Sequence, residues 1–148
     1  MTDQLRIEKQ LCFPIYLFAK EIINYYRPLL KDLELTYPQY LVMMVLWENK
    51  KSTVNEIGER LSLDSGTLTP LLKRLEKKGF VERQRSEKDE RVVEISLTHC
   101  GSNLKKAAEK VPEQLIDIMK VDQEDLETLK HLIHKVLRNK NANELDDY

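Results

Sequence analysis

Apolar residues return every three or four positions over most of the chain, the period of amphipathic α-helices. The pattern predicts helices over about 5–31, 36–47, 53–61, 64–78, 98–110 and 122–139. Around a charged turn, Ser86 to Glu90, the helical period stops, and residues 80–84 and 91–97 are predicted to pair as a β-hairpin. The chain is therefore expected to be mainly α, with about six helices and a two-stranded β-wing.

Local signals mark where several of these helices begin. Thr36 with Gln39 and Thr53 with Glu56 have the spacing of a capping box, in which two side chains satisfy free backbone N–H groups. Pro14 lacks a backbone donor, so we expect a kink or a new helix start there.

The helix after Leu63 is the most informative element. Asp64 or Ser65 is expected to cap its first turn and Gly79 its last. Its core face is leucine, and its opposite face carries short hydroxyl or basic side chains that suit the major groove of DNA. The core residues are Leu68, Leu71, Leu72 and Leu75, and the opposite face holds Ser65, Thr67, Thr69, Pro70, Lys73, Arg74 and Lys77.

Together with residues 53–61 this helix forms a helix-turn-helix pair, and the hairpin behind it is a wing. The formal net charge of the chain is only -1, but charge is unevenly distributed. Between Lys73 and Arg91 there are eight basic residues against five acidic ones, and local charge governs affinity for DNA. A merely solvated helix face is the alternative interpretation of these charges.

Composition excludes several other classes of protein. No apolar run reaches the roughly 18 residues that a membrane span needs, and the first ten residues are polar, so a cytoplasmic protein is expected. Two cysteines, Cys12 and Cys100, make no disulfide framework and lack metal-ligand spacing, so no metal or other cofactor is expected.

The whole chain, 1–148, is expected to form one domain. Within it, residues about 36–98 would be the winged helix-turn-helix, and the helices at about 5–34 and 99–139 would dimerise. The terminal helices carry more apolar surface than one small core needs, and a two-fold dimer would place two reading helices one turn of DNA apart.

Particular motifs resemble the MarR family of bacterial regulators over nearly the whole chain. They are the segment from Leu61 to Glu76, Asp89-Glu-Arg91 and Leu97-Thr98. Gln10-Leu-Cys-Phe13 with Tyr16, and Leu35-Thr-Tyr-Pro-Gln-Tyr40, are similar to the thiol-based peroxide sensors of that family, the organic-hydroperoxide-resistance repressors.

The resemblance implies a homodimeric repressor on an A·T-rich pseudo-palindromic operator in double-stranded DNA. Arg91 would enter the minor groove, oriented by Asp89, and a narrow minor groove attracts a guanidinium. Arg83 and Lys88 would meet phosphates. An ordinary exposed turn pair is the alternative for Asp89 and Arg91.

The resemblance also implies that Cys12 senses an organic peroxide. Tyr26 and Tyr37 of the other subunit, which match two tyrosines of the family, would donate hydrogen bonds to its sulfur. A thiolate attacks the peroxide, and the sulfenic acid product condenses with a thiol. Cys100 does not match the resolving cysteine of two-cysteine members, so a small cellular thiol is expected to cap Cys12. Pro14 departs from the family pattern. A small buried hydrophobe is the alternative for Cys12.

Three other functions remain open at this point. One is a regulator of the same fold that binds a phenolic or other apolar ligand, with Cys12 passive. Another is an enzyme such as a thiol peroxidase, which is not expected because the chain shows no recycling cysteine in the expected place and no Thr/Arg peroxidatic motif. The third is a purely structural interaction protein, in which the basic winged segment would have no use.

Overall fold

The computed structural model describes residues 2–143, and the surroundings of side chains from residue 3 to residue 139. The chain divides into two compact units, Met1–Val111 and Pro112–Tyr148. The single domain expected for 1–148 therefore stays a prediction, and each unit is described by itself. None of the described helices has the length and apolar character needed to cross a membrane.

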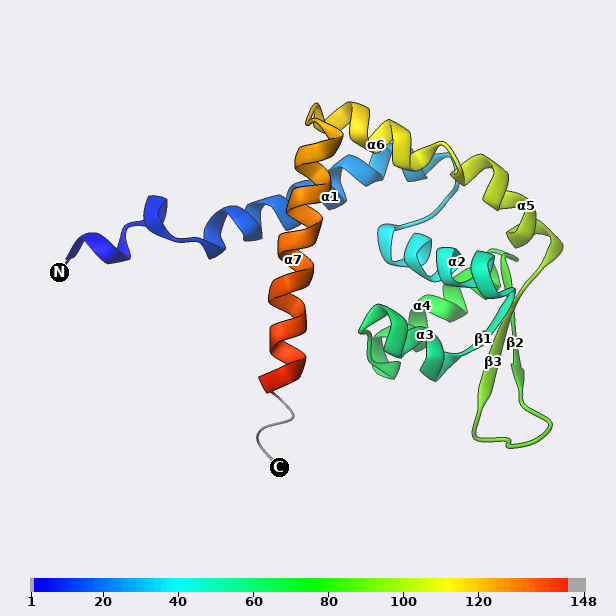
Figure 1. Cartoon of the computed structure of the whole chain (residues 1–148). Helices are drawn as coiled ribbons and strands as arrows, with labels where there is room; N and C mark the ends of the chain where they lie inside the picture. The colour runs from blue at the N-terminus through cyan, green and yellow to red at the C-terminus, as the bar shows by residue number, and fades with distance from the viewer. Residues whose placement is uncertain (1, 144–148) are drawn as a thin grey trace. The chain divides into compact units, whose positions relative to one another are not determined.

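The first unit combines α-helices with a small sheet that lies to one side of them (Figure 1). Two 3₁₀ turns, Thr2–Leu5 and Ile7–Lys9, precede the helices. The elements that follow are α1 (Cys12–Lys31), α2 (Tyr37–Asn49), β1 (Lys51–Thr53), α3 (Val54–Leu61), α4 (Ser65–Lys77), β2 (Val81–Arg85), β3 (Val93–Leu97) and α5 (His99–Ala108).

The first helix is shorter than expected. A continuous helix over 5–31 was wrong, because α1 begins only at Cys12 and Pro14 lies in its first turn. Proline is tolerated there since the first backbone N–H groups of a helix have no acceptor within it. Pro14 thus marks the helix start, one of the two outcomes predicted, whereas Pro28 lies inside α1.

The capping signals were confirmed. Thr36 and Gln39 form a complete capping box at the start of α2, and Thr53 and Glu56 form another at α3. Thr98 caps α5 by accepting a hydrogen bond from the Gly101 N–H at 3.0 Å.

The mainly α winged fold was confirmed, but the sheet has three antiparallel strands in the order β1-β3-β2 instead of two. β1 is only three residues long and pairs Ser52 with Ile95, while β2 pairs Arg83 with the same residue. A strand of three residues is too short to show an alternation of polar and apolar residues. Its last residue, Thr53, also belongs to the capping box of α3, so the sequence indicated only a helix start there. β2 and β3 run on past β1 as a hairpin that projects from the helices (Figure 1).

Helix α2 is the centre of the core. It is apolar on nearly all sides, and Val42, Met43 and Leu46 have no exposed surface, as expected of a helix packed all round. The four core leucines predicted for α4 are all buried. Trp47 of α2 donates from Nε1 to the Gly101 carbonyl at 2.9 Å, which joins α2 to α5.

The second unit contains α6 (Val111–Met119), whose first residue belongs to the first unit, and α7 (Gln123–Asn143). The residues described thus form seven α-helices where about six were expected, because the chain from Val111 folds as a helix of its own. α7 exposes Leu132, Val136 and Leu137, each more than half exposed.

Substituting Gly101 by alanine should destabilise the first unit. An added Cβ would lie 2.0 Å from the Phe80 carbonyl oxygen, a backbone atom that cannot move without shifting β2. We expect the free energy of unfolding in urea to fall by about 3 kcal/mol. Ser102→Ala, on the exposed side of the same helix, is the control, and equal stability of the two variants would contradict the packing described here.

Candidate nucleic-acid interface and thiol site

Helix α4 presents the face predicted for DNA. The carboxylate of Asp64 caps it by accepting from the Thr67 N–H at 2.7 Å, and this hydrogen bond lowers the pKa of Asp64. Because the leucines turn inward, the opposite face stays open to solvent. The residues exposed there are Ser65, Thr67, Pro70, Lys73, Arg74 and Lys77, and Thr69 beside them is half-buried.

The hairpin carries the predicted arginine at its tip. Arg91 donates from Nε and a terminal nitrogen to the two carboxylate oxygens of Asp89, both at 3.1 Å, and its backbone N–H donates to Asp89 Oδ1 at 3.0 Å. The side-chain bond from Arg91 lowers the pKa of Asp89. The Arg91 side chain is 90% exposed, so the pair holds it outward without covering it. Lys88 is also exposed.

The side chain of Arg83 is less exposed than expected of one that binds a DNA phosphate. Its side chain is 24% exposed, and its guanidinium lies 3.8 Å from the carboxylate of Glu76 on α4. Its Nε is buried, without an acceptor among the residues described. Arg83 thus bridges the wing and α4, and its predicted contact with phosphate stays a prediction.

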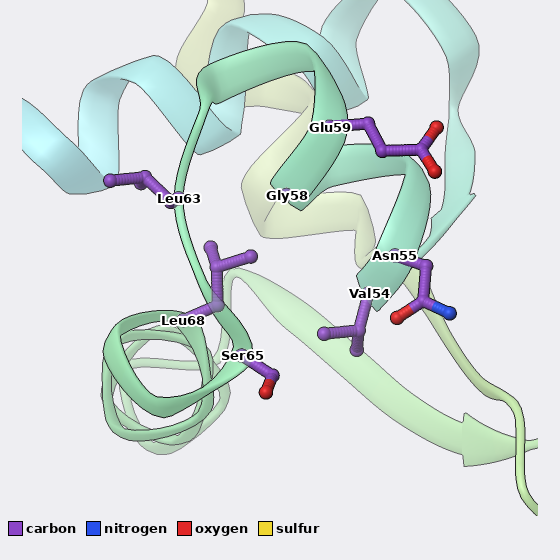
Figure 2. A pocket seen from close by; sticks show the side chains of 7 residues that line it. All are labelled: Val54, Asn55, Gly58, Glu59, Leu63, Ser65 and Leu68. Atoms are coloured by element: carbon purple, nitrogen blue, oxygen red, sulfur yellow. The ribbon is translucent and has the colours of Figure 1, made fainter. Parts of the chain in front are cut away.

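An open hollow of about 240 Å³ lies where α3 meets the start of α4. In Figure 2, Val54 and Leu68 project into the space between the two helices and the Glu59 carboxylate points outward. Pockets for drug-sized ligands usually measure about 300–1,000 Å³, so this hollow gives little support to a bound effector. Its lining residues are Val54, Asn55, Gly58, Glu59, Leu63, Ser65 and Leu68.

The three residues predicted to sense peroxide do not meet within one chain. Cys12 is the first residue of α1 and is exposed, while Tyr26 lies fourteen residues further along the same helix. At 1.5 Å per residue this separates their Cα atoms by about 21 Å along the axis. Tyr37, at the start of α2, packs on Tyr26 with the ring centroids 4.5 Å apart. One chain therefore holds the thiol and the phenol pair at opposite ends of α1.

The phenols belong to a row of aromatic rings. Tyr40 lies 5.8 Å from Tyr26 and 6.2 Å from Trp47, between ring centroids. Burial, followed by the neighbouring phenols Tyr37 and Tyr40, raises the pKa of Tyr26 to about 12. Burial also raises the pKa of Tyr37. Both phenols thus keep their protons at neutral pH and can act as hydrogen-bond donors.

Lys78, the residue after α4, links this aromatic row to the DNA-facing helix. Its ammonium group donates to the side chain of Gln39 at 3.1 Å and to the backbone carbonyl of Glu34. Gln39 is buried and forms the capping box that positions Tyr37. Glu34 has a φ of 55°, which is uncommon for a residue with a side chain. Lys78 therefore adds a polar link between the α1–α2 loop and the end of α4, beside Leu33 and Leu35 of that loop, which are buried in the same core as the α4 leucines.

Cys100 is the second residue of α5 and is exposed. Among the residues described, no group of three or more His, Cys, Asp or Glu side chains is arranged to hold a metal ion. A redox role for Cys100 is not indicated by any contact it makes.

Comparison with known proteins places this geometry in a family. Residues 24–108 match the family model described as transcriptional regulator SarA/Rot. The chain belongs to this MarR-like family. An organic hydroperoxide resistance transcriptional regulator of Bacillus subtilis is 47% identical over 135 residues, which are 91% of this chain and 92% of the relative.

Solved structures agree with this assignment. Reduced AbfR bound to DNA, a protein of Staphylococcus epidermidis, is 41% identical with a TM-score of 0.71, over 88% of this chain and 98% of that one. A cysteine-to-serine mutant of MarR from E. coli in complex with operator DNA has a TM-score of 0.78 at 28% identity, over 86% and 93% of the two chains. This SarA/Rot-family chain is thus a DNA-binding transcriptional regulator with a winged fold.

Sequence reasoning missed Lys78 and Gln39 as members of the site. Gln39 was identified as a capping residue, and Lys78 as one of several basic residues. The contact joins residues 39 positions apart, and only folding brings them together.

The raised pKa of Tyr26 predicts a specific loss of stability at high pH. An unfolded tyrosine ionises near 10 and the folded one near 12. The contribution of the neutral phenol is therefore fully present below pH 10 and is lost as the pH rises from 10 towards 12. Tyr26→Phe should flatten the decline of stability in this window, measured by urea unfolding. An unchanged pH profile in the variant would contradict the assignment.

Proposed function

We propose that the chain is a homodimeric repressor that binds an A·T-rich pseudo-palindromic operator and releases it when an organic peroxide oxidises Cys12. It would act in the bacterial cytoplasm. The observation that carries the proposal is the separation of Cys12 from Tyr26 and Tyr37 in one chain, combined with the apolar surface of α1. A second copy, paired antiparallel along α1, would bring each thiol to the phenols of the other.

Symmetry fixes where such a pair of helices would cross. In a two-fold interface, if residue 12 meets residue 26 of the partner, the residue halfway between them lies on the axis. That residue is Ala19, which is exposed and small enough for two helices to approach closely. Along α1 and at the residue just before it, six apolar side chains are each more than a third exposed. They are Leu11, Phe13, Ile15, Tyr16, Leu17 and Ile23.

The chemistry follows from the donors. A thiolate at Cys12, stabilised by two phenol O–H groups, attacks a peroxide oxygen, and the O–O bond breaks to give a sulfenic acid and an alkoxide, which takes a proton. The sulfenic acid then condenses with a low-molecular-weight thiol to a mixed disulfide and water. Either product removes the negative sulfur that held the phenols in place. The start of α2, where Tyr37 lies, and the loop before it are then free to shift.

The contacts of the DNA-facing surface follow from the same proposal. Arg91 at the wing would enter the minor groove, with Asp89 holding its orientation, and Lys88 would contact phosphate. The exposed face of α4 would enter the major groove. The list of DNA contacts proposed is Ser65, Thr67, Thr69, Pro70, Lys73, Arg74, Arg83, Lys88, Asp89 and Arg91.

Replacing Cys12 by serine tests the proposal. Reduced wild-type protein, bound to a duplex obtained by in vitro selection, should lose about a hundredfold in affinity after treatment with cumene hydroperoxide and a small thiol. Cys12→Ser should bind the same duplex and lose no affinity, because its hydroxyl is not oxidised. Cys100→Ser is the control and should respond as the wild type does. Peroxide-driven release by Cys12→Ser would contradict the proposal and favour a passive Cys12.

Lys78 is proposed to carry the change from the thiol site to α4. Lys78→Met keeps the aliphatic stem and removes the donors to Glu34 and Gln39. The DNA affinity of the reduced protein divided by that of the oxidised protein should be about fivefold smaller in this variant than in the wild type. Lys106→Met, an exposed lysine of α5, should leave the ratio unchanged. An unaltered ratio in Lys78→Met, with Cys12 still oxidised, would show that the signal travels by another route.

A further inference from the structure

Helix α4 contains a proline where it faces outward. Pro70 is the sixth of the thirteen residues of Ser65–Lys77. An α-helix bonds each carbonyl to the N–H four residues ahead, and proline has no N–H. The carbonyl of Gly66 is therefore left without its helical partner, while Thr69 and Leu71 still serve the carbonyls of Ser65 and Thr67.

This free carbonyl lies on the outermost stripe of α4. At about 100° per residue, Gly66 and Pro70 lie about 160° and 200° around the helix from Leu68. Leu68 and Leu75 have no exposed surface and mark the inner side. Gly66 and Pro70 are both exposed, and Lys73 shares their stripe. The unpaired acceptor is thus at the part of α4 that would reach deepest into a groove.

The two residue types make the carbonyl accessible. Glycine has no side chain to keep the backbone away from a base edge. Within a helix, a proline ring crowds the carbonyl four residues back, here that of Gly66, and favours a tilt of that carbonyl away from the helix axis. An acceptor in the major groove needs a donor, and the only base donors there are the amino groups of adenine and cytosine.

We propose that the Gly66 carbonyl, freed by Pro70, accepts a hydrogen bond from the exocyclic amine of one base in each half-site. In an A·T-rich operator that base is adenine. Gly66 and Pro70 then form a specificity-determining pair that reads a base through the backbone. This inference rests on the proposed function, since it requires α4 to enter the major groove.

Deleting single amino groups from the DNA tests the pair. In a duplex selected with the reduced protein, each adenine is replaced in turn by purine, which lacks the amine, and each cytosine by 2-pyrimidinone. At one position in each half-site the wild type should lose about threefold to tenfold in affinity, the effect of one hydrogen bond. In Pro70→Ala the new N–H bonds to the Gly66 carbonyl and draws it back toward the helix axis, away from the base, so the same deletion should cost less than about twofold. Lys106→Ala is the control and should keep the wild-type penalty.

A second measurement does not depend on that variant. The chain has four glycines, so labelling glycine with carbonyl ¹³C gives few signals, and Gly66→Ala identifies that of Gly66. The signal should shift when the selected duplex binds and return toward its free position with the purine-substituted duplex. Pro70→Ala should also have a higher Tm, because its helix gains a hydrogen bond.

The outcomes separate the two claims. Three results would show that the carbonyl contacts no base. They are wild-type binding that no amine deletion weakens, a Pro70→Ala variant that loses as much affinity as the wild type on amine deletion, and a Gly66 carbonyl signal that is the same with and without the amine. In all three cases the protein still binds DNA, and the proposed function stands. If the wild type selects no duplex at low salt, both the proposed function and this inference are overturned.

Discussion

The length of α1 is the constraint on which the account depends. One continuous helix carries Cys12 at its start and Tyr26 near its end, and a helix cannot fold back to join them. Tyr26 also packs against Tyr37 and Tyr40, which fixes the phenol pair at the end far from the thiol. A thiol site built from these residues therefore needs two chains, and in the proposed mechanism dimerisation and sensing depend on the same helix. The exposed apolar residues of α1 are the surface proposed for that pairing.

The core of the winged helix-turn-helix lies apart from Cys12, although Tyr26 and Tyr37 pack against it. Buried α2, the leucines of α4 and the close approach of Gly101 to Phe80 make a core that does not include Cys12. The Asp89–Arg91 pair orients the exposed arginine at the wing tip. Lys78 adds a polar contact between the two regions, because it reaches Gln39 and Glu34 from the end of α4. In the proposed mechanism this contact would carry the effect of a local oxidation to α4.

Local chemistry made much of this fold predictable. Capping boxes at Thr36 and Thr53 and the leucine spacing of α4 involve residues within a few positions of each other, and both were confirmed. Features that depend on distant partners were missed. β1 exists only because β3 lies beside it, and the Lys78–Gln39 contact joins residues far apart in the first unit. Cys12 and Arg91 could be selected from motifs, whereas their surroundings, and the bridging position of Arg83, required the folded chain.

Mixed dimers test the two-chain site most directly. Cys12→Ser subunits and Tyr26→Phe/Tyr37→Phe subunits, carrying different affinity tags, are co-expressed and the heterodimer is isolated. If each thiol uses the phenols of the other chain, the heterodimer contains one intact site, and half of its subunits should form sulfenic acid at the wild-type rate, as trapped by dimedone and read by intact mass. Reaction of the heterodimer at only the slow rate of the Tyr26→Phe/Tyr37→Phe homodimer would contradict the account.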